Sequence, residues 1–414
     1  MRDKQDTGGI YEVEKPTQQK KTPKKKPNIF LRLLAFLLTL ALMVGAVALV
    51  VYRDKFSFDA VRRWFTYRTL TRSDSGQAES FSYDGDVKDS FVAVGDNLLV
   101  CSETGLKLYS GSGVQYADTQ IVLDAPVTNS AGPYALVYEA GGNDLFVYKD
   151  KEQVFTLSDL ADKERPSGDI LSGRINPSGW LAVTARSSGY KGSVSVYDNH
   201  FQGKLALNLS SSFLTDALVS RDNKYLAAIT MGQGATSFES TLNLYQMDLL
   251  MQGGEPVPTA SCSLGGSVVL DLSESSAGYW ALGDSSLTLA GHDGASVGTY
   301  DYSGRYLKEY SLGGDDFAAL LLGKYRAGTV ADLVVVDATG KEKANLPINE
   351  QILSISASGR YLSVLTADRL DIYTSDLELY SSLEGTQSAR KVLQRSDGTA
   401  MLIGSNTARL YIPS

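Results

Sequence analysis

The sequence predicts an all-β fold, an eight-bladed β-propeller that is closed by an N-terminal strand and preceded by a single transmembrane helix. Three observations support this fold. A short apolar strand recurs eight times, successive copies lie about 43 residues apart, and an orphan strand upstream can complete the last, truncated copy. A period near this length, carried by short alternating strands, is typical of propeller blades.

The recurring strand alternates apolar residues with others and ends, in most copies, in Tyr. The steps between the fourth residues of successive copies are 39, 49, 48, 45, 46, 37 and 38 residues. Because the fifth and sixth copies lack the Tyr, a seven-bladed ring remains the alternative. The eight copies are Leu106–Tyr109, Leu145–Tyr148, Val194–Tyr197, Leu242–Tyr245, Leu287–Ala290, Leu333–Val336, Leu370–Tyr373 and Ala408–Tyr411.

The chain begins with a polar, basic segment. Residues 1–28 hold eight Lys or Arg against four Asp or Glu and almost no apolar residues, so we expect a disordered basic cytoplasmic tail. Segments of this composition cannot bury enough apolar surface to offset the entropy of ordering the chain.

An apolar segment follows, from Ile29 to Tyr52, and we expect it to attach the protein to a membrane. Its 19 residues from Leu33 to Val51 carry no charge, and 24 helical residues span about 36 Å, enough to cross a bilayer. The lysine cluster before it places the N-terminus in the cytoplasm and the propeller outside. A cleavable signal peptide with its site at 46–48 is the alternative, but the long leader and the continuing apolar run favour an uncleaved anchor.

Residues 53–77 form a juxtamembrane connector that we expect to be partly helical. Phe58, Val61, Trp64 and Phe65 recur at helical spacing, among several arginines. Such a helix either lies on a membrane surface or packs on the underside of the propeller.

From residue 78 to residue 414 each repeat reads as four strands. A turn with Gly or Asn, which supply a positive φ, joins the first two strands in several repeats. The last repeat has only three strands, and Glu79–Tyr83 can supply the fourth, which would remove two open sheet edges. In the third repeat the four strands are Ile170–Ile175, Trp180–Ala185, Ser193–Tyr197 and Lys204–Leu209.

The net charge bears on the class of partner, and the positions of the cysteines bear on disulfide formation. Residues 78–414 carry a net charge of −16, which argues against a nucleic-acid partner. The two cysteines, Cys101 and Cys262, fall in repeats one and five, too far apart in a ring for a disulfide.

The sequence offers no constellation for catalysis, and we predict no catalytic, cofactor or metal site. The two histidines, His200 and His292, lie in predicted turns, whereas a triad or a zinc site needs histidine with fixed partners. Dispersed acids at Asp144, Asp301 and 315–316 leave a cell-envelope glycan hydrolase or lyase as the alternative function.

The loops between the second and third strands open on one face of a propeller, and they carry basic and aromatic residues. Tyr and Arg are favoured at interface anchors, so these loops form a candidate binding rim on a scaffold or sensor for a protein or envelope partner. An insertion at 249–258 opens on the opposite face. The predicted rim residues are Arg186, Tyr190, Lys191, Phe238, Lys324, Tyr325 and Arg326.

The turn motif and the Leu-x-Val-Tyr-Asp strand resemble the WD40-like propeller repeats of bacteria, without the Gly-His and Trp-Asp pairs of true WD40 repeats. Together with the anchor, the segment 62–64 (Arg-Arg-Trp) and the segment 278–284 (Gly-Tyr-Trp-Ala-Leu-Gly-Asp), the chain resembles an uncharacterised family of single-pass propeller proteins from Gram-positive bacteria. This resemblance implies a cell-surface location and brings no catalytic residues. An assembly factor like the lipid-anchored propellers of outer-membrane biogenesis fits the fold by analogy alone.

Overall fold

The computed structural model describes residues 29–51, 58–68, 70–71, 73, 75–85, 89–234, 237–253 and 255–413. The chain divides into two compact units, residues 1–58 and 59–414. The predicted tail, residues 1–28, lies outside the described residues, as do residues 52–57 at the junction of the predicted anchor and connector.

Within the described residues of the second unit, the strands form eight antiparallel sheets of four strands each, and we number these blades in chain order. The first four are blade 1, β2 (Ser90–Val94), β3 (Asn97–Ser102), β4 (Gly105–Tyr109) and β5 (Gln115–Gln120); blade 2, β6 (Pro126–Ala131), β7 (Tyr134–Glu139), β8 (Leu145–Lys149) and β9 (Glu152–Thr156); blade 3, β10 (Ile170–Ile175), β11 (Leu181–Ala185), β12 (Gly192–Tyr197) and β13 (Gly203–Leu209); and blade 4, β14 (Phe213–Val219), β15 (Tyr225–Gln233), β16 (Phe238–Gln246) and β17 (Ala260–Ser263).

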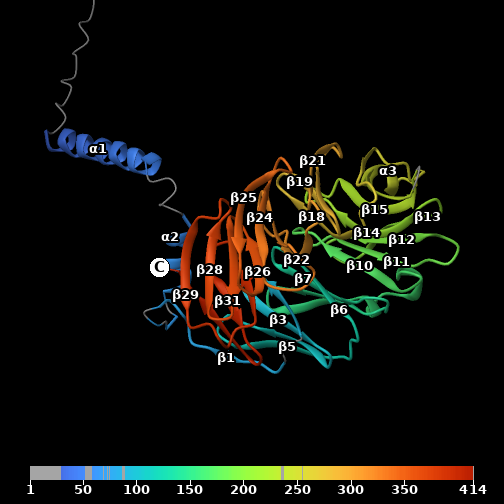
Figure 1. Ribbon diagram of the computed structural model, residues 1–414, viewed down its shortest axis with the longest axis horizontal. Coiled ribbons are helices and arrows are strands. Elements are labelled where there is room, and N and C mark those ends of the chain that lie inside the picture. Colours follow the sequence, from blue (N-terminus) through green and yellow to red (C-terminus); the bar gives the residue numbers. More distant parts are fainter. Residues whose placement is uncertain are drawn as a thin grey trace, which may run out of the picture. The chain divides into compact units, whose positions relative to one another are not determined.

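The remaining blades complete the ring, which is seen from one side in Figure 1. They are blade 5, β18 (Val269–Ser275), β19 (Gly278–Gly283), β20 (Ser286–Ala290) and β21 (Ser296–Asp301); blade 6, β22 (Tyr306–Ser311), β23 (Phe317–Gly323), β24 (Ala331–Asp337) and β25 (Glu342–Ile348); blade 7, β26 (Ile352–Ser358), β27 (Tyr361–Thr366), β28 (Arg369–Thr374) and β29 (Leu379–Glu384); and blade 8, β30 (Lys391–Gln394), β31 (Ala400–Ile403), β32 (Thr407–Tyr411) and β1 (Phe81–Ser82).

The eight-bladed prediction is confirmed, and the seven-bladed alternative is wrong. All eight recurring segments are third strands of blades, including Leu287–Ala290 and Leu333–Val336, which lack the Tyr. These two copies keep their apolar, buried character, which is enough to form the strand, because packing of the strand between neighbouring blades depends on its buried side chains.

The N-terminal strand closes the ring, as predicted. β1 pairs antiparallel with β32, with Phe81 opposite Ala408. The pairing continues on both sides of β1, since the N–H of Ala78 donates to the carbonyl of Leu410 and the N–H of Tyr83 donates to the carbonyl of Asn406. Blade 8 is therefore assembled from both ends of the propeller sequence.

The hydrophobic core lies between the blades. Each cluster of buried apolar side chains joins two neighbouring blades, and the cluster between blades 8 and 1 contains Phe81 and Leu98. Two third-strand tyrosines show how the repeat serves this core: the rings of Tyr148 and Tyr197 are buried, while the hydroxyl of Tyr197 donates to the carbonyl of Glu164. Each blade thus depends on its neighbours for burial.

The turns after the first strands have the conformation that the sequence predicts. Gly179 (φ +86°) and Gly398 (φ +87°) adopt positive φ, and in blade 4 the residue that does so is Asn223 (φ +60°). In blade 3 the side-chain oxygen of Asn176 accepts hydrogen bonds from the N–H groups of Ser178 and Trp180, which fixes this turn.

One placement made from the repeat is wrong. Cys262 lies in β17, the outer strand of blade 4, and not in the fifth repeat. The cause is the inserted segment between β16 and β17, which contains the short helix α3 (Met247–Met251) and delays the fourth strand. Cys101 and Cys262 are both free and buried.

The first unit contains α1 (Ile29–Val51), which covers the predicted anchor except for Tyr52. Its apolar side chains from Leu33 to Val44 are exposed. Among the described residues no helix is both long and apolar enough to span a bilayer, so the predicted transmembrane helix is not supported by the structure.

Candidate functional site

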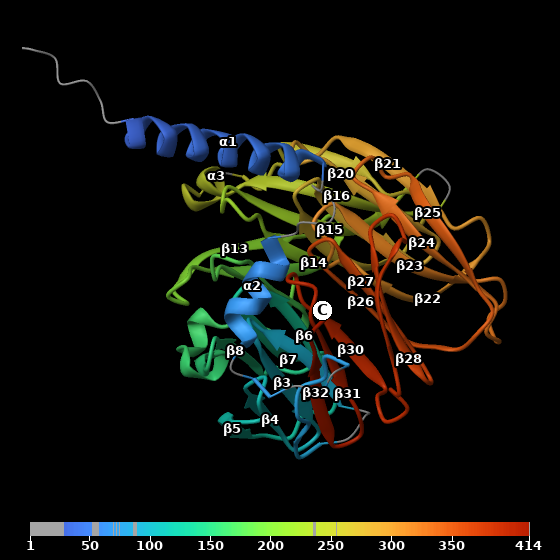
Figure 2. The same ribbon diagram turned by 90° about the vertical axis from the view of Figure 1, so that its left-hand side faces the viewer.

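We call the side of the ring that carries the turns after first and third strands the lower face, and the opposite side the upper face. Antiparallel strands place these two kinds of turn on the same side. The predicted connector contains α2 (Phe58–Tyr67), which lies on the lower face near blade 8 (Figure 2). α3 follows a third strand and therefore belongs to the lower face as well, as predicted for the insertion at 249–258.

Three polar side chains attach α2 to the ring. Arg63, only 3% exposed, donates from Nη1 to the backbone carbonyl of Asp397 (2.6 Å) and from Nη2 to the hydroxyl of Tyr380 (2.7 Å). The Oδ2 atom of Asp59 accepts a hydrogen bond from the hydroxyl of Tyr361 at 3.0 Å. Of the two alternatives for the connector, packing on the underside of the propeller is the one that the structure supports.

The third of these side chains, Tyr67, completes a buried network at the end of blade 8. Its hydroxyl donates to Oδ2 of Asp397 (2.9 Å) and accepts from Nη1 of Arg395 (3.3 Å). Burial raises the pKa of Tyr67, so the phenol stays neutral. Arg395 also donates to the carbonyl of Asp96 in blade 1 (2.6 Å) and thereby ties blade 8 to blade 1. We call Asp59, Arg63 and Tyr67 with these partners the α2 lock.

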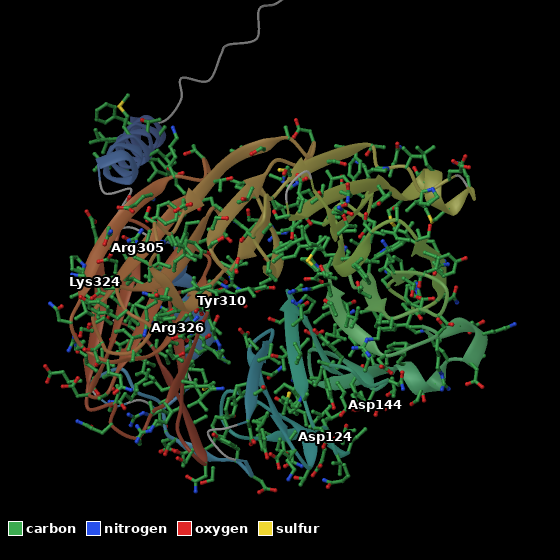
Figure 3. All side chains as sticks on the ribbon, turned by 45° about the vertical axis from the view of Figure 1, so that its right-hand side comes forward. Asp124, Asp144, Arg305, Tyr310, Lys324 and Arg326 are labelled. Atoms are coloured by element: carbon green, nitrogen blue, oxygen red, sulfur yellow. The ribbon has the colours of Figure 1, made fainter. Side chains whose placement is uncertain are left out.

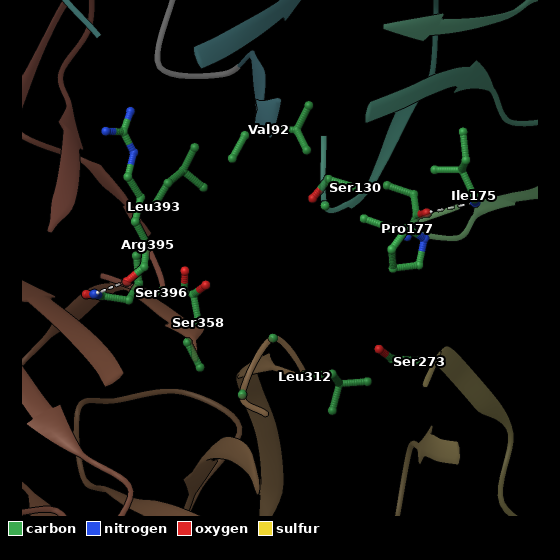
Figure 4. A pocket seen from close by; sticks show the side chains of 18 of the residues that line it. Val92, Ser130, Ile175, Pro177, Ser273, Leu312, Ser358, Leu393, Arg395 and Ser396 are labelled. Atoms are coloured by element: carbon green, nitrogen blue, oxygen red, sulfur yellow. Dashed lines mark hydrogen bonds between the residues drawn. The ribbon is translucent and has the colours of Figure 1, made fainter. Parts of the chain in front are cut away.

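A central cavity of about 570 Å³ opens between the inner strands on the lower face. Residues from all eight blades line it, and Figure 4 shows labelled members such as Val92, Ser130, Ser273 and Leu312 around the opening. Arg62 of α2 also lines it.

A β-bulge recurs near the upper end of the inner strands of blades 3 to 7. In each case the pairing with the second strand skips one residue, and a bulge of this kind redirects the side chains that follow it. The residue immediately after the skipped one is polar in all five blades. We call this set the inner-strand belt; it consists of Ser172, Asp216, Asp271, Glu309 and Ser354.

Arg174 joins two carboxylates of the belt. Its Nη2 lies 2.6 Å from Oδ2 of Asp216 and 2.6 Å from Oδ1 of Asp271, which come from two successive blades. Burial by itself would lower the pKa of Arg174, but the two carboxylates outweigh it and raise the pKa. Tyr310, labelled in Figure 3, lies next to Asp271, and burial followed by the charge of Asp271 raises its pKa. The cluster links three blades.

Glu309 occupies the other side of the belt. Burial raises its pKa to about 7, although its carboxylate accepts a hydrogen bond from the N–H of Ile355 at 3.1 Å. Similar bonds join the inner strands of blades 7 and 8, where Ser354 and Ser356 accept from backbone N–H groups. The belt therefore connects neighbouring blades through the hydrogen bonds and ion pairs of its polar side chains.

The carboxylates considered for a glycan hydrolase do not come together. Asp144 lies in the loop between β7 and β8 on the upper face, and Asp301 ends the outer strand of blade 5. Asp315 lies in the turn after β22 on the lower face and lines the cavity. A retaining or inverting mechanism needs two carboxyl groups within about 5–10 Å on either side of one bond, and these acids lie on different blades and opposite faces.

Both histidines lie in turns on the lower face, as predicted. The N–H of His200 donates to Oδ1 of Asp198, which shapes the turn after β12. His292 lies in the turn after β20, with Nδ1 3.4 Å from a carboxylate oxygen of Glu274. Among the described residues no group of three or more His, Cys, Asp or Glu side chains could hold a metal ion.

The predicted rim residues all lie on the upper face and are exposed, but they form two groups. Arg186, Tyr190 and Lys191 lie in the loop after β11, with Phe238 of the next blade at the start of β16. The second group, 324–326, follows β23 in blade 6, so blade 5 separates the two groups. Figure 3 labels Lys324 and Arg326 of this second group.

Aromatic rings lie beneath three of the four rim cations, Lys191, Lys324 and Arg326. Nζ of Lys191 is 5.2 Å from the ring centroid of Phe213, and the guanidinium of Arg326 is 5.8 Å from that of Tyr306. Lys308 donates to the carbonyl of Arg326 at 2.7 Å and supports the second loop from below. These contacts hold long side chains in place at exposed positions.

Sequence reasoning missed part of this surface. Further exposed apolar residues lie on the upper side of blades 4 to 6, where an inner strand begins or a long loop ends. These residues could have been identified from the sequence, because each lies beside a Ser- or Gly-rich connection between strands. They are Phe213, Val268, Leu270, Tyr306 and Val330.

The protein is a WD40-like β-propeller, with α2 attached to its lower face and exposed loops on its upper face. The model of a family of unknown function, DUF5711, matches residues 67–409, and the chain belongs to this family. No curated protein matches the sequence.

Solved structures share the fold at low identity. The C-terminal WD40 domain of Sif2 is 13% identical, with 82% of this chain and 99% of that chain covered and a TM-score of 0.56. Sqt1 of Chaetomium thermophilum, solved bound to the N-terminus of ribosomal protein L10, is 13% identical, with 80% and 99% covered and a TM-score of 0.51. BamB from Moraxella catarrhalis is 12% identical, with 81% and 96% covered and a TM-score of 0.49. The likenesses to Sif2 and Sqt1 establish the fold alone.

Proposed function

We propose that this protein is a membrane-tethered, extracytoplasmic scaffold or sensor that binds a protein partner with its upper face. One observation carries the proposal: the upper loops of blades 3, 4 and 6 expose aromatic rings beside cations on a domain that is otherwise acidic. Aromatic and arginine side chains supply most of the binding energy at protein interfaces.

The cation–ring contacts support this proposal further. Because Lys191 and Arg326 already rest on rings, less side-chain freedom is lost when a partner binds. Sqt1, which has the same fold, is described as bound to a peptide segment of a ribosomal protein. The comparison supports a protein partner as the class of ligand and says nothing about its identity.

Attachment to a membrane through residues 29–52 is the second part of the proposal. It is supported by the uncharged stretch from Leu33 to Val51 and by the exposure of the described apolar side chains of α1. Lysines before this stretch favour a cytoplasmic N-terminus. Extraction of membranes with alkaline carbonate should leave the full chain in the pellet, and a reporter fused after Ser414 should be active only outside the cytoplasm. Release into the supernatant would contradict the anchor, and reporter activity in the cytoplasm would contradict the orientation.

Photocross-linking of the full chain tests the upper face. A photoreactive residue at Tyr190 or at Tyr325 should capture the same protein in the native membrane, whereas one at Lys341, in an exposed turn of the lower face, should not. Replacing Tyr190, Phe238 and Tyr325 together by Ala should reduce capture by roughly tenfold or more. Equal capture from both faces would refute a binding role for the upper face.

A further inference from the structure

α2 presents its side chains in the opposite way to an ordinary surface helix. Asp59, Arg63 and Tyr67 are four residues apart and form one stripe, and this polar stripe is the side that faces the ring. Trp64 and Phe65 are 59% and 61% exposed. A helix on a soluble domain normally buries its apolar stripe and exposes its polar one, so the aromatic pair needs a partner outside the ring.

The α2 lock keeps this pair outside. Trp64 and Phe65 pack edge to face with their ring centroids 4.9 Å apart, so they form one continuous apolar surface. Turning the helix to bury them would break the bonds from Arg63 to Asp397 and Tyr380, and would leave a guanidinium without acceptors.

The charges around the pair favour an anionic partner. Arg62 and Arg68 flank the two aromatic residues in the sequence and are exposed, and Arg62 also borders the central cavity. The only acid of the helix, Asp59, is already engaged by Arg360, whose Nε lies 3.4 Å from its carboxylate. The exposed side of α2 is therefore positive, although the propeller sequence as a whole is strongly acidic.

We propose that this side of α2 docks into the head-group layer of an anionic lipid bilayer. Trp and Arg together are typical of the membrane interface, where the ring enters the head-group layer and the cation meets anionic lipids. Six residues, 52–57, separate α2 from α1 in the sequence, a reach of about 20–25 Å. The inference rests on the membrane attachment proposed above, and it adds that the lower face is held against the lipid surface.

Trp64 provides a probe in the full chain. The protein has three tryptophans, of which Trp280 is fully buried and Trp180 is half-buried. Subtracting the fluorescence of a Trp64→Phe variant from that of the unchanged protein isolates the signal of Trp64. The full chain is mixed with vesicles of phosphatidylcholine, or of phosphatidylcholine with phosphatidylglycerol, and flotation separates the bound protein.

On vesicles that contain phosphatidylglycerol, acrylamide should quench Trp64 at least about twofold less, and brominated lipid should quench it directly, as expected for a ring in the interface. Arg62→Glu with Arg68→Glu should abolish the protection. Arg186→Glu with Arg326→Glu, the same charge change on the upper face, should leave it unchanged.

The outcomes separate the two proposals. Protein that does not float with either vesicle contradicts both the membrane attachment and the docking of α2. Protein that floats while Trp64 stays as accessible as in solution supports attachment and overturns the docking of α2. Loss of protection in both charge-reversed variants would show general attraction to the vesicle and would also overturn it.

Discussion

Arginine side chains have opposite roles at the inner-strand belt and in the upper-face loops. Arg174 contacts two carboxylates from successive blades, with 16% of its side chain exposed. Arg326 is exposed and rests on the ring of Tyr306. A charge removed from water must be matched by fixed partners, whereas an exposed charge needs none. The difference separates residues that hold the ring together from residues that are free to bind.

Arg174 should give the largest effect on stability. Arg174→Met removes the partner of two carboxylates and should lower the free energy of unfolding by about 2–4 kcal/mol, somewhat below the range for a fully buried pair because the side chain borders the cavity. Urea denaturation followed by circular dichroism measures the change. Arg326→Met is the matched control on the upper face. An equal loss of stability in both variants would contradict the distinction between the buried and the exposed arginine.

Arg63 of the α2 lock should stabilise the fold in the same way as Arg174 does at the belt. Arg63→Ala removes hydrogen bonds to Asp397 and Tyr380 and should cost about 2–3 kcal/mol, because a buried carbonyl loses its donor. Arg62→Ala, one residue earlier and exposed, should change stability by less than about 0.5 kcal/mol. The same denaturation experiment would refute the lock if both variants behaved alike.

Glu309 makes the belt sensitive to pH. Burial raises its pKa from 4.5 to about 7, so the folded state binds the proton more tightly than the unfolded chain. Its contribution to stability is fully present below pH 4.5 and is lost as pH rises to about 7, by about 1–2 kcal/mol once partial exposure is taken into account. Glu309→Gln should flatten this part of the stability profile. An unchanged slope between pH 4.5 and pH 7 in the variant would assign the effect to another group.

The smallest effect on stability is expected at the upper face. Replacing Tyr190, Phe238 and Tyr325 by Ala should change the free energy of unfolding by no more than about 0.5 kcal/mol for each residue, since all three are exposed. Thermal melts of the purified protein measure this. A large loss would mean that the loops support the ring, and the proposed division between binding and structural residues would fail.

The sequence was informative where local chemistry determines structure. The recurrence of Leu145–Tyr148 and its counterparts predicted third strands, and the missing fourth strand after Tyr411 predicted closure by Glu79–Tyr83. Both signals are local, since a strand pattern and a missing segment can be read without knowing distant partners.

Contacts between distant residues could not be predicted in this way. Arg63 meets Asp397 across 334 positions, and nothing near Arg63 in the sequence indicates that it is buried while Trp64 is exposed. The inner-strand belt could not be predicted either, because one skipped residue in the strand pairing decides which side chain of an inner strand faces its neighbours. The upper-face loops were found because exposed loops need no distant partner.

The closing strand has a consequence for biosynthesis. β1 is made before every blade, but its partner β32 is the last of the described strands to be made, 327 residues later for the pair Phe81 and Ala408. At roughly 5–20 residues per second the ribosome needs about 16–65 seconds to bridge that interval. Throughout this time residues near Phe81 have no strand to pair with. Completion of the ring therefore requires that translation has passed β32, and a chain that stops before β32 keeps unpaired strand edges.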